Sequence, residues 1–116
     1  EDAVAVVRFG DWTVCLVADG MGGLAAGEVA SRTAVESLGK LLAASLPGLI
    51  SADGIKAAIR DAIVRVNEEI MAMGAADPNL ANMGSTIVLC AWRTGVPLMF
   101  VANVGDSRAY HIKRTT

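Results

Sequence analysis

Two helical patterns follow each other along this chain with no strand-like segment between them, and strand-like segments flank them on both sides. The first pattern begins at Gly23 and the second after Ser51. The second carries a regular apolar stripe: Ile55, Ile59, Ile63, Val66, Ile70 and Met73. Apolar steps of three and four residues are typical of a helix with one buried face. Because a parallel sheet needs strands and helices to alternate, this arrangement favours an antiparallel sheet.

Short turns join the strand-like segments within each group. Residues 2–9 and 12–18 are separated by Gly10-Asp11, and residues 85–92, 98–103 and 109–113 follow the second helix. Strands joined by tight turns pair antiparallel. The predicted fold class is α+β, in the order β-β-α-α-β-β-β, with a two-helix layer on antiparallel strands. Residues 85–92 show no polar alternation, so we expect that strand to be buried on both faces.

Composition limits the classes of partner. The 116 residues carry a net charge of −2, with acids and bases interspersed, so the basic patch that nucleic acid requires is absent. No apolar run approaches the roughly 18 residues of a membrane span, and no membrane partner is expected. Cys15 and Cys90 lie inside apolar runs and are predicted to be buried small hydrophobic residues. A reducing, cytoplasmic setting fits this usage.

The glycine-rich stretch between the first strands and the first helix has three interpretations. Gly20, Gly22 and Ala25 satisfy the spacing of a dinucleotide-binding turn. A second helix follows where that motif needs a strand, and the carboxylate of Asp19 would face the pyrophosphate, so this interpretation is disfavoured. The two others are a metal site and a simple turn cap.

Carboxylates gather at predicted strand ends. Asp19 ends one strand, and Gly20 could expose its carbonyl oxygen to a cation. Pairing about Gly10-Asp11 would bring Asp2 to the same end as Asp19, and Asp106 lies in a later turn. Mg²⁺ and Mn²⁺ prefer such oxygen ligands. Aspartate beside glycine also commonly caps a turn, and spacing alone leaves these two interpretations equally open.

Four motifs in order resemble a known family. They are "EDA" at 1–3, "VADGMGG" at 17–23, "GSTIVLCAW" at 84–92 and "NVGDSRAY" at 103–110. Together they are similar to the metal-dependent serine/threonine protein phosphatases of type 2C, in the bacterial branch that includes stage II sporulation E-like phosphatases. The resemblance implies an α-β-β-α sandwich of antiparallel sheets, here a partial one. Residues 1–116 would be the N-terminal portion of a single phosphatase domain.

The resemblance also implies a site and a reaction. Asp19 would bridge two Mg²⁺ or Mn²⁺ ions and act in catalysis through a metal-bound water. The Gly20 carbonyl and Glu1 would be ligands of one of these metals, Asp2 a neighbour in the shell, and Asp106 the aspartate associated with a third, weaker metal. The implied reaction is hydrolysis of phosphoserine or phosphothreonine in a phosphoprotein substrate.

The resemblance leaves an alternative function open, a non-catalytic regulatory or interaction module that keeps the fold. Two further metal-binding aspartates of the family have no counterpart in these residues, so the isolated chain is expected to be nearly inactive. Gly84, Ser85 and Thr86 are assigned a packing role only. As the N-terminal portion of a domain, the chain by itself would leave strand edges and one sheet face uncovered, and the apolar run from Ile87 to Trp92 would then be exposed on that face. We therefore expect a homodimer or a strand swap.

Overall fold

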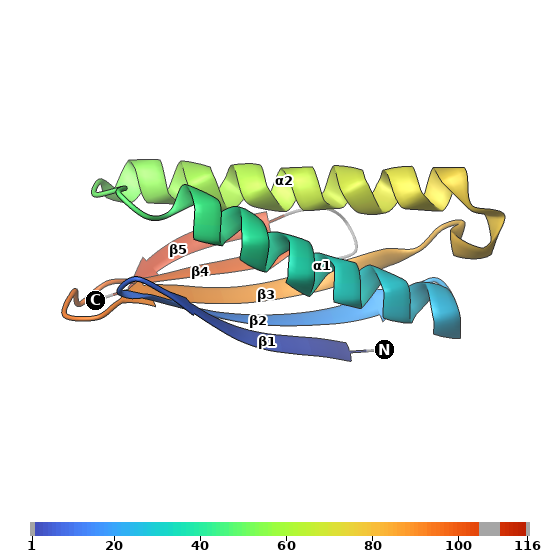
Figure 1. Cartoon of the computed structure of the whole chain (residues 1–116), viewed down its shortest axis with the longest axis horizontal. Coiled ribbons are helices and arrows are strands. Elements are labelled where there is room, and N and C mark those ends of the chain that lie inside the picture. The colour runs from blue at the N-terminus through green and yellow to red at the C-terminus, as the bar shows by residue number, and fades with distance from the viewer. Residues whose placement is uncertain (1, 105–109, 116) are drawn as a thin grey trace.

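The protein forms one antiparallel sheet that two helices cover on a single face (Figure 1). The computed structural model describes residues 2–104 and 110–115. The elements are β1 (Asp2–Phe9), β2 (Trp12–Met21), α1 (Leu24–Ser45), α2 (Ala52–Ala76), the 3₁₀ turn η1 (Pro78–Leu80), β3 (Gly84–Arg93), β4 (Met99–Val104) and β5 (Tyr110–Thr115). The five strands lie side by side in chain order. The predicted α+β class and element order are confirmed, and the described residues contain this one sheet.

The hairpin of β1 and β2 forms as predicted. Gly10 adopts a φ of 59°, as the first central residue of a type II′ turn does. From this turn the two strands pair in register, with Phe9 opposite Trp12 and Asp2 opposite Asp19. The hairpin therefore brings both aspartates to the end of the sheet away from the turn.

The core lies between the sheet and the helices. Alternate residues of β2 face the helices and are buried, from Trp12 to Ala18. The predicted apolar faces of both helices meet them. The buried helical residues include Ala30, Ala34, Leu38, Leu42, Ile55, Ile59, Ile63, Val66 and Ile70. Ser51 caps α2 by accepting a hydrogen bond from the Gly54 amide at 3.0 Å, and α2 continues through Gly74 to Ala76.

The other face of the sheet is uncovered among the described residues, and we call it the open face. It comprises Asp2, Val4, Val6 and Arg8 of β1, Thr13, Cys15, Val17 and Asp19 of β2, Thr86, Val88, Cys90 and Trp92 of β3, and Met99, Val101 and Asn103 of β4. The prediction that residues 85–92 are buried on both faces is wrong. Ile87, Leu89 and Ala91 are buried under the helices, whereas Val88 between them is 46% exposed. Both helices pack on the same side, which accounts for the difference.

The two cysteines also depart from the prediction. Cys15 and Cys90 are half-buried on the open face, directly opposite each other, and both are free thiols. Cys90 Sγ lies 3.3 Å from Met99 Sδ. Partial burial, with a smaller contribution from Cys15, raises the pKa of the Cys90 thiol. Cys90 is therefore less ionised near neutral pH than an exposed cysteine.

Candidate metal centre

Asp2 and Asp19 form the centre of the candidate site. They are direct cross-strand partners at the end of the β1–β2 hairpin, and both are exposed on the open face. Side chains of such partners have Cβ atoms about 4.5–5.5 Å apart, close enough for two carboxylates to share one cation. Like charges directly opposite each other destabilise a sheet, so a cation bound between them would stabilise this end.

The backbone of Asp19 is held by β3. Its amide donates a hydrogen bond to Thr86 Oγ1 at 3.2 Å. Its carbonyl oxygen accepts from Ser85 Oγ at 3.4 Å and from Thr86 Oγ1 at 3.5 Å. The sequence interpretation gave Ser85 and Thr86 only a packing role. These contacts add a positioning role, and finding it required the register that sets Asp19 opposite Thr86.

Gly20 lies where β2 passes under the start of α1. A Cβ atom added to Gly20 would overlap the carbonyl group of Gly27, and one added to Gly27 would lie 3.1 Å from the Gly20 carbonyl oxygen. The first turn of α1 therefore rests directly on the backbone that follows Asp19. Two glycines remove the side chains that would otherwise separate the helix from the candidate site.

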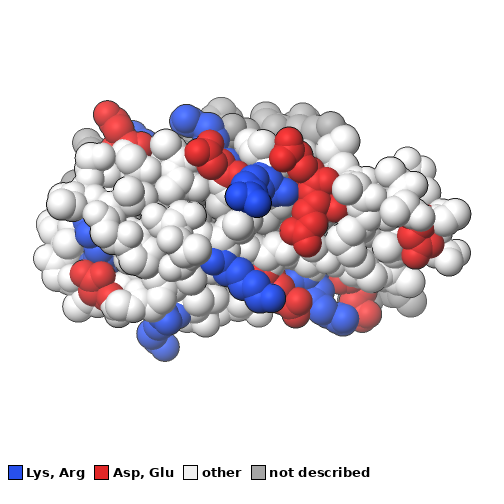
Figure 2. All heavy atoms as spheres, turned by 45° about the horizontal axis from the view of Figure 1, so that its top comes forward, with Lys and Arg blue, Asp and Glu red and all other residues white. Residues whose placement is uncertain are grey.

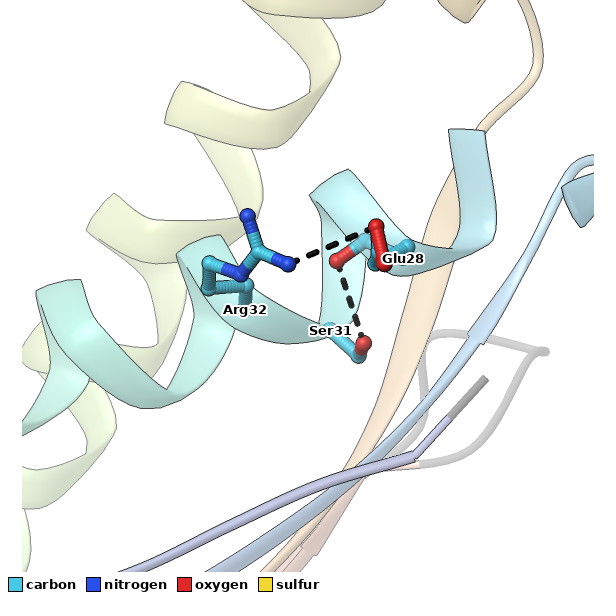
Figure 3. A network of polar contacts seen from close by, with 3 residues as sticks. All are labelled: Glu28, Ser31 and Arg32. Carbon is cyan, nitrogen blue, oxygen red and sulfur yellow. Dashed lines mark hydrogen bonds and ion pairs between the residues drawn. The ribbon is translucent and has the colours of Figure 1, made fainter. Parts of the chain in front are cut away.

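The next turn of α1 is tied by local polar contacts (Figure 3). Arg32 forms an ion pair with Glu28, with Nη2 and Oε1 3.4 Å apart. The buried Ser31 donates a hydrogen bond from Oγ to the Glu28 carbonyl oxygen at 3.3 Å. Over the helical face, acidic and basic side chains are intermixed and no large patch of one sign forms (Figure 2).

The predicted ligands are placed as follows. Asp2, Asp19 and Gly20 lie at one end of the sheet. Glu1 and Asp106 lie outside the described residues. β4 ends at Val104, which is opposite Ile87 of β3. Ile87 is in turn opposite Ala18, so β4 finishes at the same end of the sheet as Asp19. Within residues 2–104 and 110–115, no group of three or more His, Cys, Asp or Glu side chains is arranged to hold a metal.

The donor chemistry fits a hard divalent cation in part. Carboxylate and carbonyl oxygens at Asp2, Asp19 and Gly20 suit Mg²⁺ or Mn²⁺ better than a soft metal. The described residues provide two carboxylates, and a complete site would need further ligands.

In the part of the chain that the structure describes, neither helix is long and apolar enough to cross a bilayer.

Sequence comparison connects this geometry to known proteins. Residues 1–115 match the family model described as Protein phosphatase 2C. The serine/threonine phosphatase stp of Listeria welshimeri is 36% identical over 103 residues, which are 89% of this chain and 40% of that protein. The chain thus spans well under half the length of this curated relative.

Solved structures give the same result. The serine/threonine phosphatase Stp1 from Staphylococcus aureus superposes with a TM-score of 0.78 at 27% identity, covering 99% of this chain and 46% of that chain. A stage II sporulation E family protein from Thermanaerovibrio acidaminovorans gives a TM-score of 0.65 at 25% identity, covering 90% and 45%. The family model extends over nearly every residue, and the chain belongs to the protein phosphatase 2C family.

Proposed function

We propose that this chain takes part in hydrolysing phosphoserine and phosphothreonine in proteins, with Mg²⁺ or Mn²⁺ bound where Asp2 and Asp19 meet. The observation that carries the proposal is the direct pairing of these two carboxylates at one end of the sheet. The names of the relatives, which are serine/threonine phosphatases, support the choice of substrate class.

Each residue has a defined part in this proposal. Asp19 would hold the cations together with the Gly20 carbonyl and Glu1, Asp2 would lie beside these ligands, and Asp106 would hold a further, weaker cation. Cations bound there would supply Lewis-acid chemistry that makes a water more acidic. The hydrogen bonds that the Asp19 backbone makes with the hydroxyl groups of Ser85 and Thr86 hold this strand end in place beneath the Asp19 carboxylate.

The cysteines take no part in the proposed reaction. Cys15 lies four residues before Asp19 on the same strand, which is about 13 Å along β2. The raised pKa of Cys90 also makes it a poor nucleophile at neutral pH. We also propose a reducing compartment, the cytoplasm, where Cys15 and Cys90 would remain thiols.

The test is Mn²⁺-dependent release of phosphate from a phosphothreonine peptide by the protein that carries this chain. Asp19→Ala is expected to abolish turnover, because the candidate site would lose one of its two paired carboxylates. Asp11→Ala, at the turn on the opposite end of the hairpin, is the matched control and should retain activity. Turnover that survives a chelator, or that survives Asp19→Ala, would contradict the proposal.

A non-catalytic regulatory or interaction module is the second candidate. It is favoured by one observation, that the described residues assemble two carboxylates and no larger metal-binding group. This candidate predicts that Mn²⁺ binds, as followed by calorimetry, and that Asp19→Asn weakens binding while phosphopeptide is never hydrolysed. The two functions therefore differ in turnover and agree in metal binding.

A further inference from the structure

Among the described strands, β1 lies at an edge of the sheet and has no strand on its outer side. It ends the row of described strands, and β2 is its neighbour there. In an antiparallel sheet every second residue of an edge strand directs its N–H and C=O groups away from the sheet. Such an edge is a template for another strand. β1 also carries two exposed valines, Val4 at 71% and Val6 at 55%.

The sequence of β1 is complementary to itself in one antiparallel register. When a second copy pairs so that opposing residue numbers add up to ten, Asp2 faces Arg8, Val4 faces Val6, and Ala5 faces Ala5 of the other copy. Asp2, Val4, Val6 and Arg8 all lie on the open face, so each pair meets on one side of the joined sheet. Opposite charges and β-branched side chains are favourable cross-strand partners.

A groove runs beside this edge, between β1 and α1. Its volume is about 510 Å³, its floor is made by small apolar residues of β1, and Arg32, Glu36 and Lys40 stand on its helical side. With Glu28 these residues form a ladder of alternating charge along α1. If a two-fold axis passes beside residue 34 of α1, Glu28 of one copy lies opposite Lys40 of the other. The same axis places Arg32 of one copy opposite Glu36 of the other. The ladder is therefore also complementary to itself.

Both sets of charges share the same axis. A Cβ atom added to Gly39 would lie 3.4 Å from Val7 Cγ2, so residue 39 of α1 is beside residue 7 of β1. Ala5 lies two residues before Val7 on the strand, which is a distance of about 6.6 Å along β1. The same distance along α1 corresponds to roughly four residues before Gly39. The axis through Ala5 thus passes close to residue 34 of α1, the centre of the ladder.

We propose that two copies of this chain pair through β1 about a two-fold axis at Ala5. The product is one continuous sheet with the helices of both copies on the same face, and the two charge ladders stand on opposite walls of a common groove. The interface is isologous, so the β1 edge of each copy is paired in the dimer and no further copy can add through β1. The proposal does not depend on phosphatase activity.

The first test is sedimentation equilibrium of the 116-residue chain and two charge variants. Asp2→Lys sets lysine opposite Arg8, and Arg8→Glu sets glutamate opposite Asp2, so each variant alone should associate about tenfold more weakly than the parent. Mixed in equal amounts, the two variants regain opposite charges at both positions and should recover the parent affinity. A mixture that associates no better than its separate components would overturn the proposal.

The second test fixes the register. In a Cys15→Ser, Cys90→Ser background, Ala5→Cys places two thiols directly opposite each other, and mild oxidation should give a covalent dimer. Ala3→Cys is the matched control, because residue 3 faces residue 7 of the other copy and its thiols lie beyond disulfide reach. Equal cross-linking of both variants, or none at residue 5, contradicts the register. Val88→Lys, on the open face away from the edge, should leave association unchanged. If this variant no longer associates, the copies would be stacking face to face instead.

Discussion

Gly20 is restricted to glycine by contact alone, whereas two of its neighbours adopt a backbone conformation that favours glycine. Gly22 and Gly23 have φ values of 118° and 97°, which side chains rarely adopt. Gly20 lies in β2, and the constraint on it is the carbonyl group of Gly27. The sequence predicts a tight turn for this stretch and a Gly20 carbonyl that could face a cation. The separate reason at Gly20 depends on a residue seven positions later and could not be read locally.

Gly20→Ala should destabilise the protein by about 2 kcal/mol or more, because the new methyl group can be accommodated only by moving the α1 backbone off the strand. Gly39→Ala is the control, since its methyl would meet only side-chain atoms, the nearest at 3.4 Å, and it should change stability by no more than about 1 kcal/mol. Urea unfolding followed by circular dichroism measures both. Equal effects at the two positions would show that the Gly20–Gly27 contact is not limiting.

At the scale of elements, the cap of α2 is a local signal that the structure confirms. Ser51→Ala removes the bond to the Gly54 amide and should cost about 1 kcal/mol of unfolding free energy. Ser45→Ala is the matched control, because that hydroxyl only donates to the Leu41 carbonyl near the end of α1. Its effect should stay within about 0.5 kcal/mol. A loss at Ser45 as large as that at Ser51 would contradict the capping argument.

Sequence patterns predicted the elements well and the second face of β3 poorly. Helical stripes, tight turns and the cap at Ser51 depend on neighbours a few residues apart. The run from Ile87 to Trp92 says only that polar alternation is absent. Whether Val88 and Cys90 are covered depends on the layer packed against them, which no local pattern contains. The sequence could predict that Asp2 and Asp19 lie at the same end of the sheet, because a two-residue turn fixes the register of the hairpin.

At the scale of the whole molecule, the open face is the most exposed apolar surface among the described strands. Replacing Val17 and Val88 together by threonine should slow aggregation of the isolated chain on heating, because both are nearly half exposed on the inner strands β2 and β3. Turbidity during a thermal ramp measures this. Val14→Thr, at a fully buried position, is the contrasting control and should lower the midpoint of unfolding. Unchanged turbidity of the double variant would exclude the open face as the aggregating surface.

The bonds between Asp19 and Thr86 also determine when the candidate site forms during folding. They join residues 67 positions apart, across both helices. The β1–β2 hairpin and each helix can form from local contacts within microseconds, whereas pairing of β2 with β3 must first close this long segment. We expect the backbone of Asp19 to be fixed among the last events of folding. On the ribosome, the hairpin can form while α2 is still being synthesised, but the candidate metal centre must wait until Thr86 has left the exit tunnel.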